Sequence, residues 1–156
     1  MNAKNQTCQI CGRLIKANTG IIAHHGYKRP DRGSGWQTAS CAGARHLPYE
    51  VSCDMLTPTI EYIKHHISKV EVKLNDHINN PPKTLIIQVG GYFRRIEKEV
   101  MLPETFDAKN PPCCVRIYSY EGKHSDIRRK LQQDIKYSNQ DLKYMEERLK
   151  NWIPPK

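Results

Sequence analysis

Two long segments of the chain carry apolar residues in the period of a packed helix. In the first, the seam positions alternate in steps of four and three residues: Leu56, Ile60, Ile63, Ile67, Val70, Leu74 and His77. This is a heptad seam, the stripe along which one helix packs on another. Thr57 suits the N-cap, Pro58 suits the first helical turn, and Pro81-Pro82 stop the helix. We expect a helix over about residues 57–79.

The C-terminal segment repeats this pattern over a similar length. The same steps of four and three join Leu131, Ile135, Ser138, Leu142, Met145, Leu149 and Trp152. The pattern predicts a second helix over about residues 123–152. Because the chain must reverse direction between the two segments, we expect an antiparallel two-helix coiled-coil hairpin. Equal seams also allow the helices of two chains to pair, which would make a homodimer.

Between the two helical segments the period changes. Residues 84–89 are short and β-branched, as in a strand, and Gly90-Gly91 follow as a turn. Residues 92–101 fit either a short helix or a strand, and the glycine pair favours a hairpin. Residues 114–120 alternate like a third strand. We expect a small sheet over about residues 84–120, inserted at the tip of the helical hairpin.

The first 55 residues show short apolar runs separated by glycines. Residues 19–24 and 35–39 predict two paired strands, joined by a basic loop over residues 27–34. We therefore expect an α+β fold with two parts. A small β module covers residues 1–55, and the helical hairpin with its inserted sheet covers residues 56–156.

The composition limits the size of the core and the expected location. Only 38% of the residues are hydrophobic, so we expect a small core that needs a further stabilising element. No stretch approaches the roughly 18 apolar residues that span a bilayer, and none resembles a signal peptide. We expect a cytoplasmic protein without a membrane partner, in the host cytoplasm if a phage encodes it. Its six cysteines then stay reduced.

The net charge of +9 is unevenly distributed. Lysine and arginine outnumber the acids by seven to two in residues 1–50 and by nine to five in residues 123–156, while the middle carries nine of each. Two basic ends suit a polyanionic partner, which we expect to be nucleic acid, a nucleoprotein complex or an acidic protein surface. The candidate contacts of the first part are Arg13, Lys28, Arg29, Arg32 and Arg45.

The cysteines and histidines of the first part have the spacing of metal ligands. Cys8 and Cys11 form a Cys-x2-Cys knuckle, and a histidine and a third cysteine return later in the chain. His24 and His25 are adjacent, so only one should face the knuckle. We prefer Cys8, Cys11, His25 and Cys41 as ligands of one structural zinc ion, with His24, His46 and Cys53 as alternatives. Cys113 and Cys114 more often fill core or surface positions.

These motifs resemble those of a loose group of phage and bacterial zinc-binding proteins with no established activity. The similarity covers about residues 8–55 and rests on four strings: Cys8-x2-Cys11, His25-Gly-Tyr27, Cys41-x-Gly43 and Pro48-Tyr-Glu-Val-Ser52. In that group the aligned histidine and the single later cysteine recur. The resemblance therefore favours His25 and Cys41 over His46 and Cys53, and it implies a phage or prokaryotic origin.

Three functional hypotheses follow. The first is a non-catalytic zinc-binding basic protein that binds nucleic acid or a nucleoprotein complex as a regulator or inhibitor, for example of a host defence system. The second is a His-metal-finger nuclease, with His24 as general base and His46 or Asp54 as ligand of a second metal. The missing second Cys-x2-Cys knuckle argues against the nuclease. The third is an adaptor that pairs its seams with another protein's helix.

Overall fold

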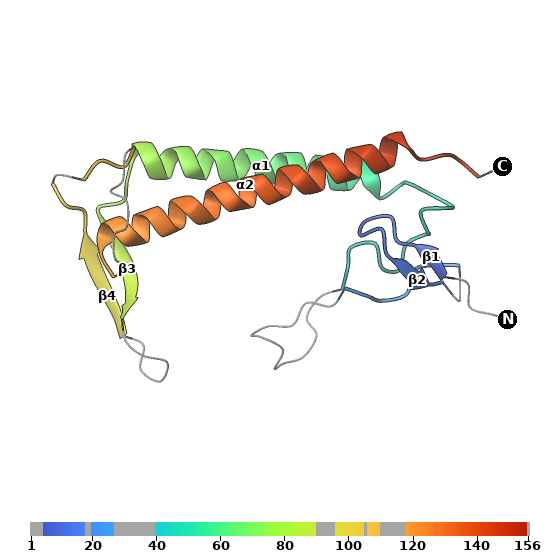
Figure 1. Cartoon of the computed structure of the whole chain (residues 1–156), viewed down its shortest axis with the longest axis horizontal. Helices are drawn as coiled ribbons and strands as arrows, with labels where there is room; N and C mark the ends of the chain where they lie inside the picture. Colours follow the sequence, from blue (N-terminus) through green and yellow to red (C-terminus); the bar gives the residue numbers. More distant parts are fainter. Residues whose placement is uncertain are drawn as a thin grey trace. The chain divides into compact units, whose positions relative to one another are not determined.

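The computed structural model describes residues 5–17, 20–26, 40–89, 96–104, 106–109 and 118–155. Within these residues the fold is α+β, with two helices and two small antiparallel sheets (Figure 1). The order of elements is β1 (Asn5–Thr7), β2 (Leu14–Lys16), α1 (Leu56–Asn79), β3 (Thr84–Val89), β4 (Ile96–Met101) and α2 (Tyr120–Lys150).

The chain divides into two compact units. Unit 1 is formed by Met1–Lys64 together with Asp141–Lys156, and unit 2 by His65–Gln140. Unit 1 thus holds the predicted metal module, the first turns of α1 and the last turns of α2. Unit 2 holds the rest of both helices and the β3–β4 hairpin.

Helix α1 confirms the predicted helix within one residue at its start. All seven seam positions are buried or half-buried, because they form the one apolar stripe of the helix. The prediction of Thr57 as the N-cap is wrong, since the helix already begins at Leu56. A residue far away in the sequence supports the start of the helix, because the backbone N–H of Met55 donates to the Gln9 side chain (3.0 Å).

Helix α2 is also confirmed, but it begins at Tyr120 rather than near Lys123. The reason is Ser119, which acts as the N-cap: its hydroxyl accepts the Gly122 N–H (3.2 Å), and its carbonyl accepts the Lys123 N–H (3.0 Å). The expected third strand over residues 114–120 is therefore wrong at Tyr120, and its residues 114–117 lie outside the described part.

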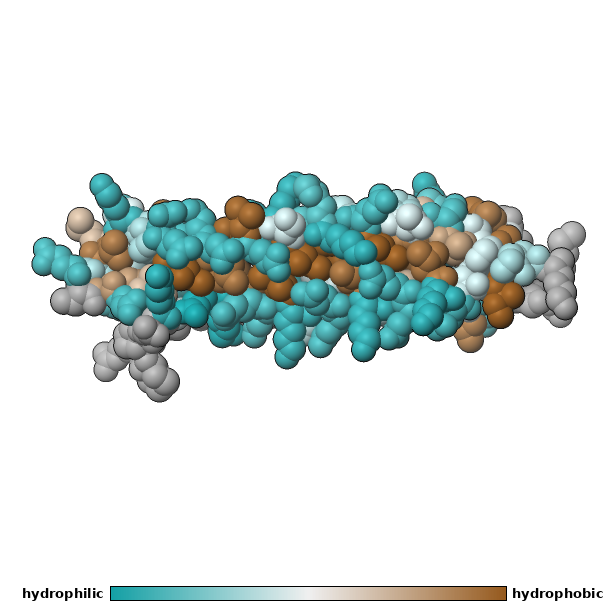
Figure 2. All heavy atoms as spheres, turned by 90° about the horizontal axis from the view of Figure 1, so that it is seen from above, coloured by the Kyte–Doolittle hydropathy of each residue, from teal (hydrophilic) through white to brown (hydrophobic). Residues whose placement is uncertain are grey.

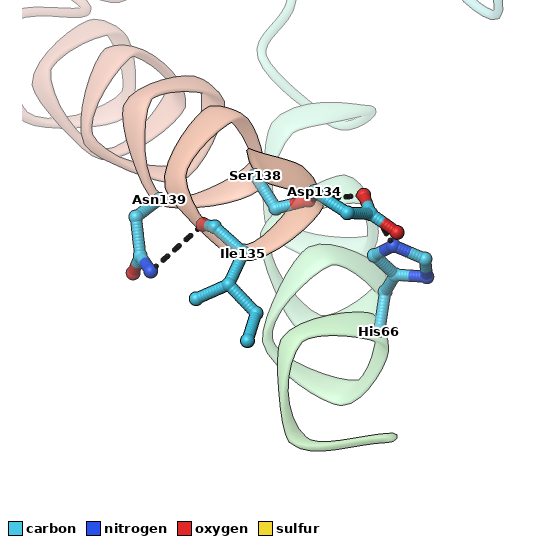
Figure 3. A network of polar contacts seen from close by, with 5 residues as sticks. All are labelled: His66, Asp134, Ile135, Ser138 and Asn139. Carbon is cyan, nitrogen blue, oxygen red and sulfur yellow. Dashed lines mark hydrogen bonds and ion pairs between the residues drawn. The ribbon is translucent and has the colours of Figure 1, made fainter. Parts of the chain in front are cut away.

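Within each unit, α1 and α2 contact each other in antiparallel order. In unit 1, Leu56, Ile60 and Met145 form a buried cluster. In unit 2, the His66 ring contacts the Asp134 carboxylate (3.1 Å; Figure 3), which also accepts the Ser138 hydroxyl (3.5 Å). Apolar side chains form a stripe along the helices, with hydrophilic side chains on both sides (Figure 2).

The predicted hairpin is confirmed in β3 and β4, which pair antiparallel from Thr84↔Met101 to Val89↔Ile96. Ile87 is 2% exposed and anchors the buried face, while its neighbours Ile86 and Gln88 point outward. The predicted Gly90-Gly91 turn lies outside the described residues.

The first sheet differs from the expectation. It consists of β1 and β2, which flank the Cys-x2-Cys knuckle and pair from Asn5↔Lys16 to Thr7↔Leu14. The strand predicted over residues 19–24 is wrong for its described part, residues 20–24. The N–H of Ile22 donates to His46 O and the N–H of Ala23 to Lys16 O, so its hydrogen bonds go to two different segments and form no ladder. Its expected partner, residues 35–39, lies outside the described residues.

In the described part of the chain, neither helix has the length and apolarity that crossing a membrane requires.

Candidate metal centre

Four side chains of unit 1 meet at one point: Cys8, Cys11, His25 and Cys41. Their ligand atoms all lie within 4.8 Å of one another. The Sγ atoms of Cys8 and Cys41 are 3.9 Å apart, and Cys11 Sγ is 3.2 Å from His25 Nε2. The edge between two sulfurs in a tetrahedral zinc site is about 3.8 Å, given zinc–sulfur bonds of about 2.3 Å. The structure thus brings together the four preferred ligands in a group that could bind one metal ion.

The knuckle supplies the first two ligands through a tight backbone turn. Cys8 N–H donates to Arg13 O (2.9 Å), and Gly12 N–H donates to Cys8 O (3.0 Å). Gly12 has a φ of +69°, a conformation that side chains other than hydrogen disfavour. This turn, fixed by the β1–β2 pair on either side, directs both thiols to one side.

His25 and Cys41 supply the other two ligands and are joined by their own backbone. Cys41 N–H donates to His25 O (2.8 Å), and the same carbonyl accepts the Ser40 hydroxyl (3.0 Å). Gly43 lies directly under the cluster, where a Cβ atom would collide with Cys8 Sγ. The glycine of the Cys41-x-Gly43 string therefore allows the close approach of the two halves.

The His25 ring is held in the tautomer that a metal ligand needs. Its Nδ1 atom lies 2.8 Å from the carbonyl oxygen of Ala23. A carbonyl only accepts, so Nδ1 carries the hydrogen and Nε2 presents its lone pair toward Cys11. The ring is 7% exposed, so it is almost fully removed from water.

The thiols of Cys8 and Cys11 differ in their tendency to ionise. Burial raises the pKa of Cys8 to about 11, although the backbone N–H groups of Cys11 and Ile10 oppose this. Burial also acts on Cys11, but hydrogen bonds from the backbone and guanidinium of Arg13 oppose it, and the pKa of Cys11 is lowered to about 6. One thiolate therefore forms readily at neutral pH. A bound cation would supply the positive charge that favours ionisation of the Cys8 thiol.

The alternative ligands lie outside this four-residue group. The His24 ring is exposed, and its Nε2 accepts a hydrogen bond from Arg45 Nε (2.8 Å). Cys53 packs against the apolar cluster of Leu56, Ile60 and Met145. His46 joins the fold through its carbonyl, which accepts the Ile22 N–H (2.9 Å).

The residues of the nuclease hypothesis have structural contacts of their own. The Asp54 carboxylate accepts the Ser52 hydroxyl (2.6 Å) and the Gln9 amide (2.8 Å). The hydrogen bond from Ser52, followed by that from Gln9, holds the pKa of Asp54 below its usual range. His24 is bonded to Arg45 as described above. The nuclease hypothesis stays a prediction.

Of the predicted partner contacts, Arg13 and Arg45 belong to the described residues. The Arg13 guanidinium hydrogen-bonds to Cys11 and lies against Gly26, at the edge of the metal cluster. Arg45 is exposed and has a φ of +66°. Lys28, Arg29 and Arg32 lie outside the described residues, as does the whole predicted basic loop over residues 27–34.

Two residues that support the knuckle were not predicted: Gln9 and Arg148. Gln9 is fully buried, and its amide donates to Leu47 O (2.8 Å). Arg148 packs over the Tyr49 ring, with Cζ 4.0 Å from the ring centre. No sequence signal pointed to Gln9, because its burial depends on Leu47 and Asp54, which lie far away in the sequence. The same is true of Arg148, because its partners also lie far away in the sequence.

Comparison of the chain with protein-family models, with curated proteins and with solved structures gives no match. The resemblance of residues 8–55 to phage and bacterial zinc-binding proteins therefore stays a prediction.

Proposed function

We propose that the chain is a non-catalytic, basic zinc-binding protein whose metal ion is structural. The observation that carries this proposal is the cluster of Cys8, Cys11, His25 and Cys41. Three thiols and one imidazole are ligands that favour tetrahedral zinc over harder ions such as Mg²⁺. Four protein ligands also leave no open coordination position, which is the arrangement of a structural rather than a catalytic site.

Metal analysis and cobalt substitution test the zinc proposal. Purified protein should contain close to one zinc per chain, and Co²⁺ should give the intense visible bands of tetrahedral thiolate coordination. Cys41→Ser should abolish both signals, whereas Cys53→Ser, which changes a cysteine outside the cluster, should leave both intact. Full zinc retention in Cys41→Ser would refute the ligand set.

We further propose that the basic surface of the metal module binds nucleic acid or a nucleoprotein complex. The net charge of +9 supports a polyanionic partner. Arg45 adds a specific candidate, because its exposed guanidinium is oriented by the hydrogen bond to His24. A guanidinium held in this way can form two parallel hydrogen bonds to one phosphate.

Salt-dependent binding tests this partner class. Replacing Lys28, Arg29 and Arg32 together with alanine should weaken binding equally for all sequences. On duplex DNA, the slope of log affinity against log salt should fall by about 0.9 for each phosphate that the variant no longer neutralises. The zinc content should not change. If wild-type protein binds neither duplex nor single strands at low salt, an acidic protein partner replaces nucleic acid.

The two heptad seams support a coiled-coil pairing of α1 and α2. The contacts between these helices within each unit are consistent with pairing inside one chain. Pairing between chains would make a homodimer or an adaptor for another protein's helix. Analytical ultracentrifugation over a range of concentrations separates these, because a hairpin within one chain gives a constant mass.

A further inference from the structure

Arg148, near the C-terminal end of α2, contacts the backbone of the metal knuckle. Its Nε–H donates to Gln9 O (3.0 Å), and its Nη2–H donates to Cys8 O (3.1 Å). These partners are 139 and 140 residues away in the sequence. One guanidinium therefore binds two successive carbonyls of the turn that presents Cys8 and Cys11.

These two carbonyls belong to the turn that holds a ligand. Cys8 O also accepts the Gly12 N–H (3.0 Å), and the Cys8 N–H donates to Arg13 O (2.9 Å), so the Cys8 backbone is fixed on both sides. A guanidinium that bridges Cys8 O and Gln9 O keeps these two residues in one orientation. Arg148 thus helps to hold the Cys8 side chain where its Sγ lies close to the other three ligand atoms.

The guanidinium is held in place from several sides. Its flat face lies over the Tyr49 ring, and the Tyr49 hydroxyl donates to the carbonyl of Arg148 (2.6 Å). Trp152 Nε1–H donates to Tyr49 O (2.7 Å), which secures the backbone of the same tyrosine. At Gly12 a Cβ atom would lie 3.2 Å from Arg148 Nη1, so the knuckle and the helix end are closely packed.

We propose that Arg148 is a positioning residue of the metal centre, which acts through the carbonyls of Cys8 and Gln9 and links metal binding to the docking of the last turns of α2. The inference rests on the proposed metal binding. Outer-shell partners of metal ligands typically contribute about 10–100-fold to metal affinity. Because such coupling is reciprocal, the metal must strengthen the docking of residues 141–152 by the same factor.

The experiment measures both sides of this coupling in the full chain. Zinc affinity is obtained by competition with a chromogenic chelator, and hydrogen exchange of residues 141–152 is followed with and without zinc. Arg148→Ala should lower zinc affinity by about tenfold or more. The extra protection that zinc gives to residues 141–152 should shrink by the same factor. Arg148→Lys keeps the charge but cannot reach both carbonyls, so its affinity should be intermediate.

Two control variants separate positioning from simple helix docking. Lys150→Ala removes an exposed cation from the same turn and should change neither quantity. Tyr49→Phe removes the hydrogen bond to the α2 backbone but keeps the ring under Arg148. It should lower the protection of residues 141–152 while leaving zinc affinity within about twofold of wild type, well short of the loss expected for an outer-shell residue.

The outcomes are distinct for the two proposals. Wild-type protein that binds no zinc refutes the metal centre and this inference with it. Wild-type protein that binds zinc, with unchanged affinity in Arg148→Ala, refutes only the role of Arg148. Equal losses in Tyr49→Phe and Arg148→Ala also refute it, because docking alone would then explain the effect. If Arg148→Ala does not fold, an affinity of Arg148→Lys equal to wild type overturns the inference.

Discussion

Both units contain parts of α1 and α2, but they bury different kinds of polar side chain. Unit 1 buries Gln9, whose amide donates to Leu47 O and to the Asp54 carboxylate, both from distant parts of the chain. Unit 2 buries His124 against other rings and leaves its Nδ1 without a hydrogen-bond partner among the described residues. In the part of the chain that the structure describes, neither unit has a large apolar core. The two units compensate in different ways: unit 1 has a cluster of three cysteines and one histidine that could bind a metal ion, and unit 2 has stacked rings.

The stacked rings of unit 2 centre on His77 and His124. Their ring centres are 3.9 Å apart with an interplanar angle of 17°. Each ring donates its Nε2–H to the other residue's carbonyl, at 3.1 Å and 3.0 Å. Phe106 meets the His124 ring edge-on, at 4.9 Å between centres. This pair joins α1 to α2 through stacked rings and backbone carbonyls.

The largest expected effect comes from removing a metal ligand, which should affect the two units unequally. Cys8→Ser should lose the metal and with it the order of unit 1, because structural zinc supplies roughly 10 kcal/mol in small domains. Hydrogen exchange should rise in residues 5–17 and 40–55 and stay unchanged in residues 65–89. Equal loss of protection in both units would show that the units fold as one.

Truncation of core side chains should separate the units more finely. Leu56 in unit 1 is fully buried, and Ile87 in unit 2 is 2% exposed. Changing either to alanine should lower the free energy of unfolding of its own unit by about 2–5 kcal/mol. Leu14→Ala is the control, because that side chain is 68% exposed. Hydrogen exchange of individual residues, measured at increasing denaturant concentrations, gives the free energy of unfolding of each unit.

Acidification should weaken unit 2 through His124. Burial, and secondarily the nearby charges of His77 and Arg128, lower the pKa of His124, while its hydrogen bond to His77 acts in the opposite direction. Below the ordinary histidine pKa of about 6.5, the unfolded chain therefore binds more protons than the folded one. The stabilisation is complete above that pH and decreases as the pH falls toward the folded-state value.

The groups around His124 define the control for this pH effect. His77 comes from α1, and Tyr120 and Arg128 come from α2, while the loop contributes the uncharged ring of Phe106 and its exposed neighbours Asp107 and Lys109. His124→Phe should lower the stability of unit 2 at neutral pH but flatten its change between pH 7 and pH 5. An unaltered pH profile in this variant would exclude His124 as the group responsible.

The smallest expected effect concerns the ion pair of Lys64 and Glu146 in unit 1. Their charged atoms are 2.8 Å apart, but the side chains are 56% and 48% exposed. Water screens such a pair, so a double-mutant cycle with alanine should give a coupling energy below about 1 kcal/mol. A larger coupling energy would show that this exposed ion pair makes a substantial contribution to the stability of unit 1.

The sequence predicted the parts of the fold that depend on local periodicity. Both helices follow from their seams, and the hairpin follows from the β-branched residues 84–89. The metal ligands could be chosen because a Cys-x2-Cys knuckle needs two more ligands, and His25 lies beside the flexible Gly26. The start of α2 also had a local signal, the N-cap Ser119, which the alternation of residues 114–120 obscured.

The remaining features depend on contacts that no local pattern encodes. Strands β1 and β2 have three residues each, too few for a recognisable alternation. Residues 20–24 looked like a strand, but their hydrogen bonds go to two separate segments. Arg148 carries no motif, and its position next to Cys8 depends on the path of both helices. Such non-local contacts determined what sequence reasoning missed.

The contact between Arg148 and the knuckle also has a consequence for the order of synthesis. The ribosome makes Cys8, Cys11, His25 and Cys41 early, then all of unit 2, and only afterwards Arg148. At synthesis rates of about 5–20 residues per second, the interval between Cys41 and Arg148 lasts roughly 5–20 s. During that time the nascent chain exposes a complete set of thiols without its outer-shell arginine. Early metal capture would protect these thiols, and under the proposed role of Arg148 the final affinity would be reached only when the end of α2 has emerged.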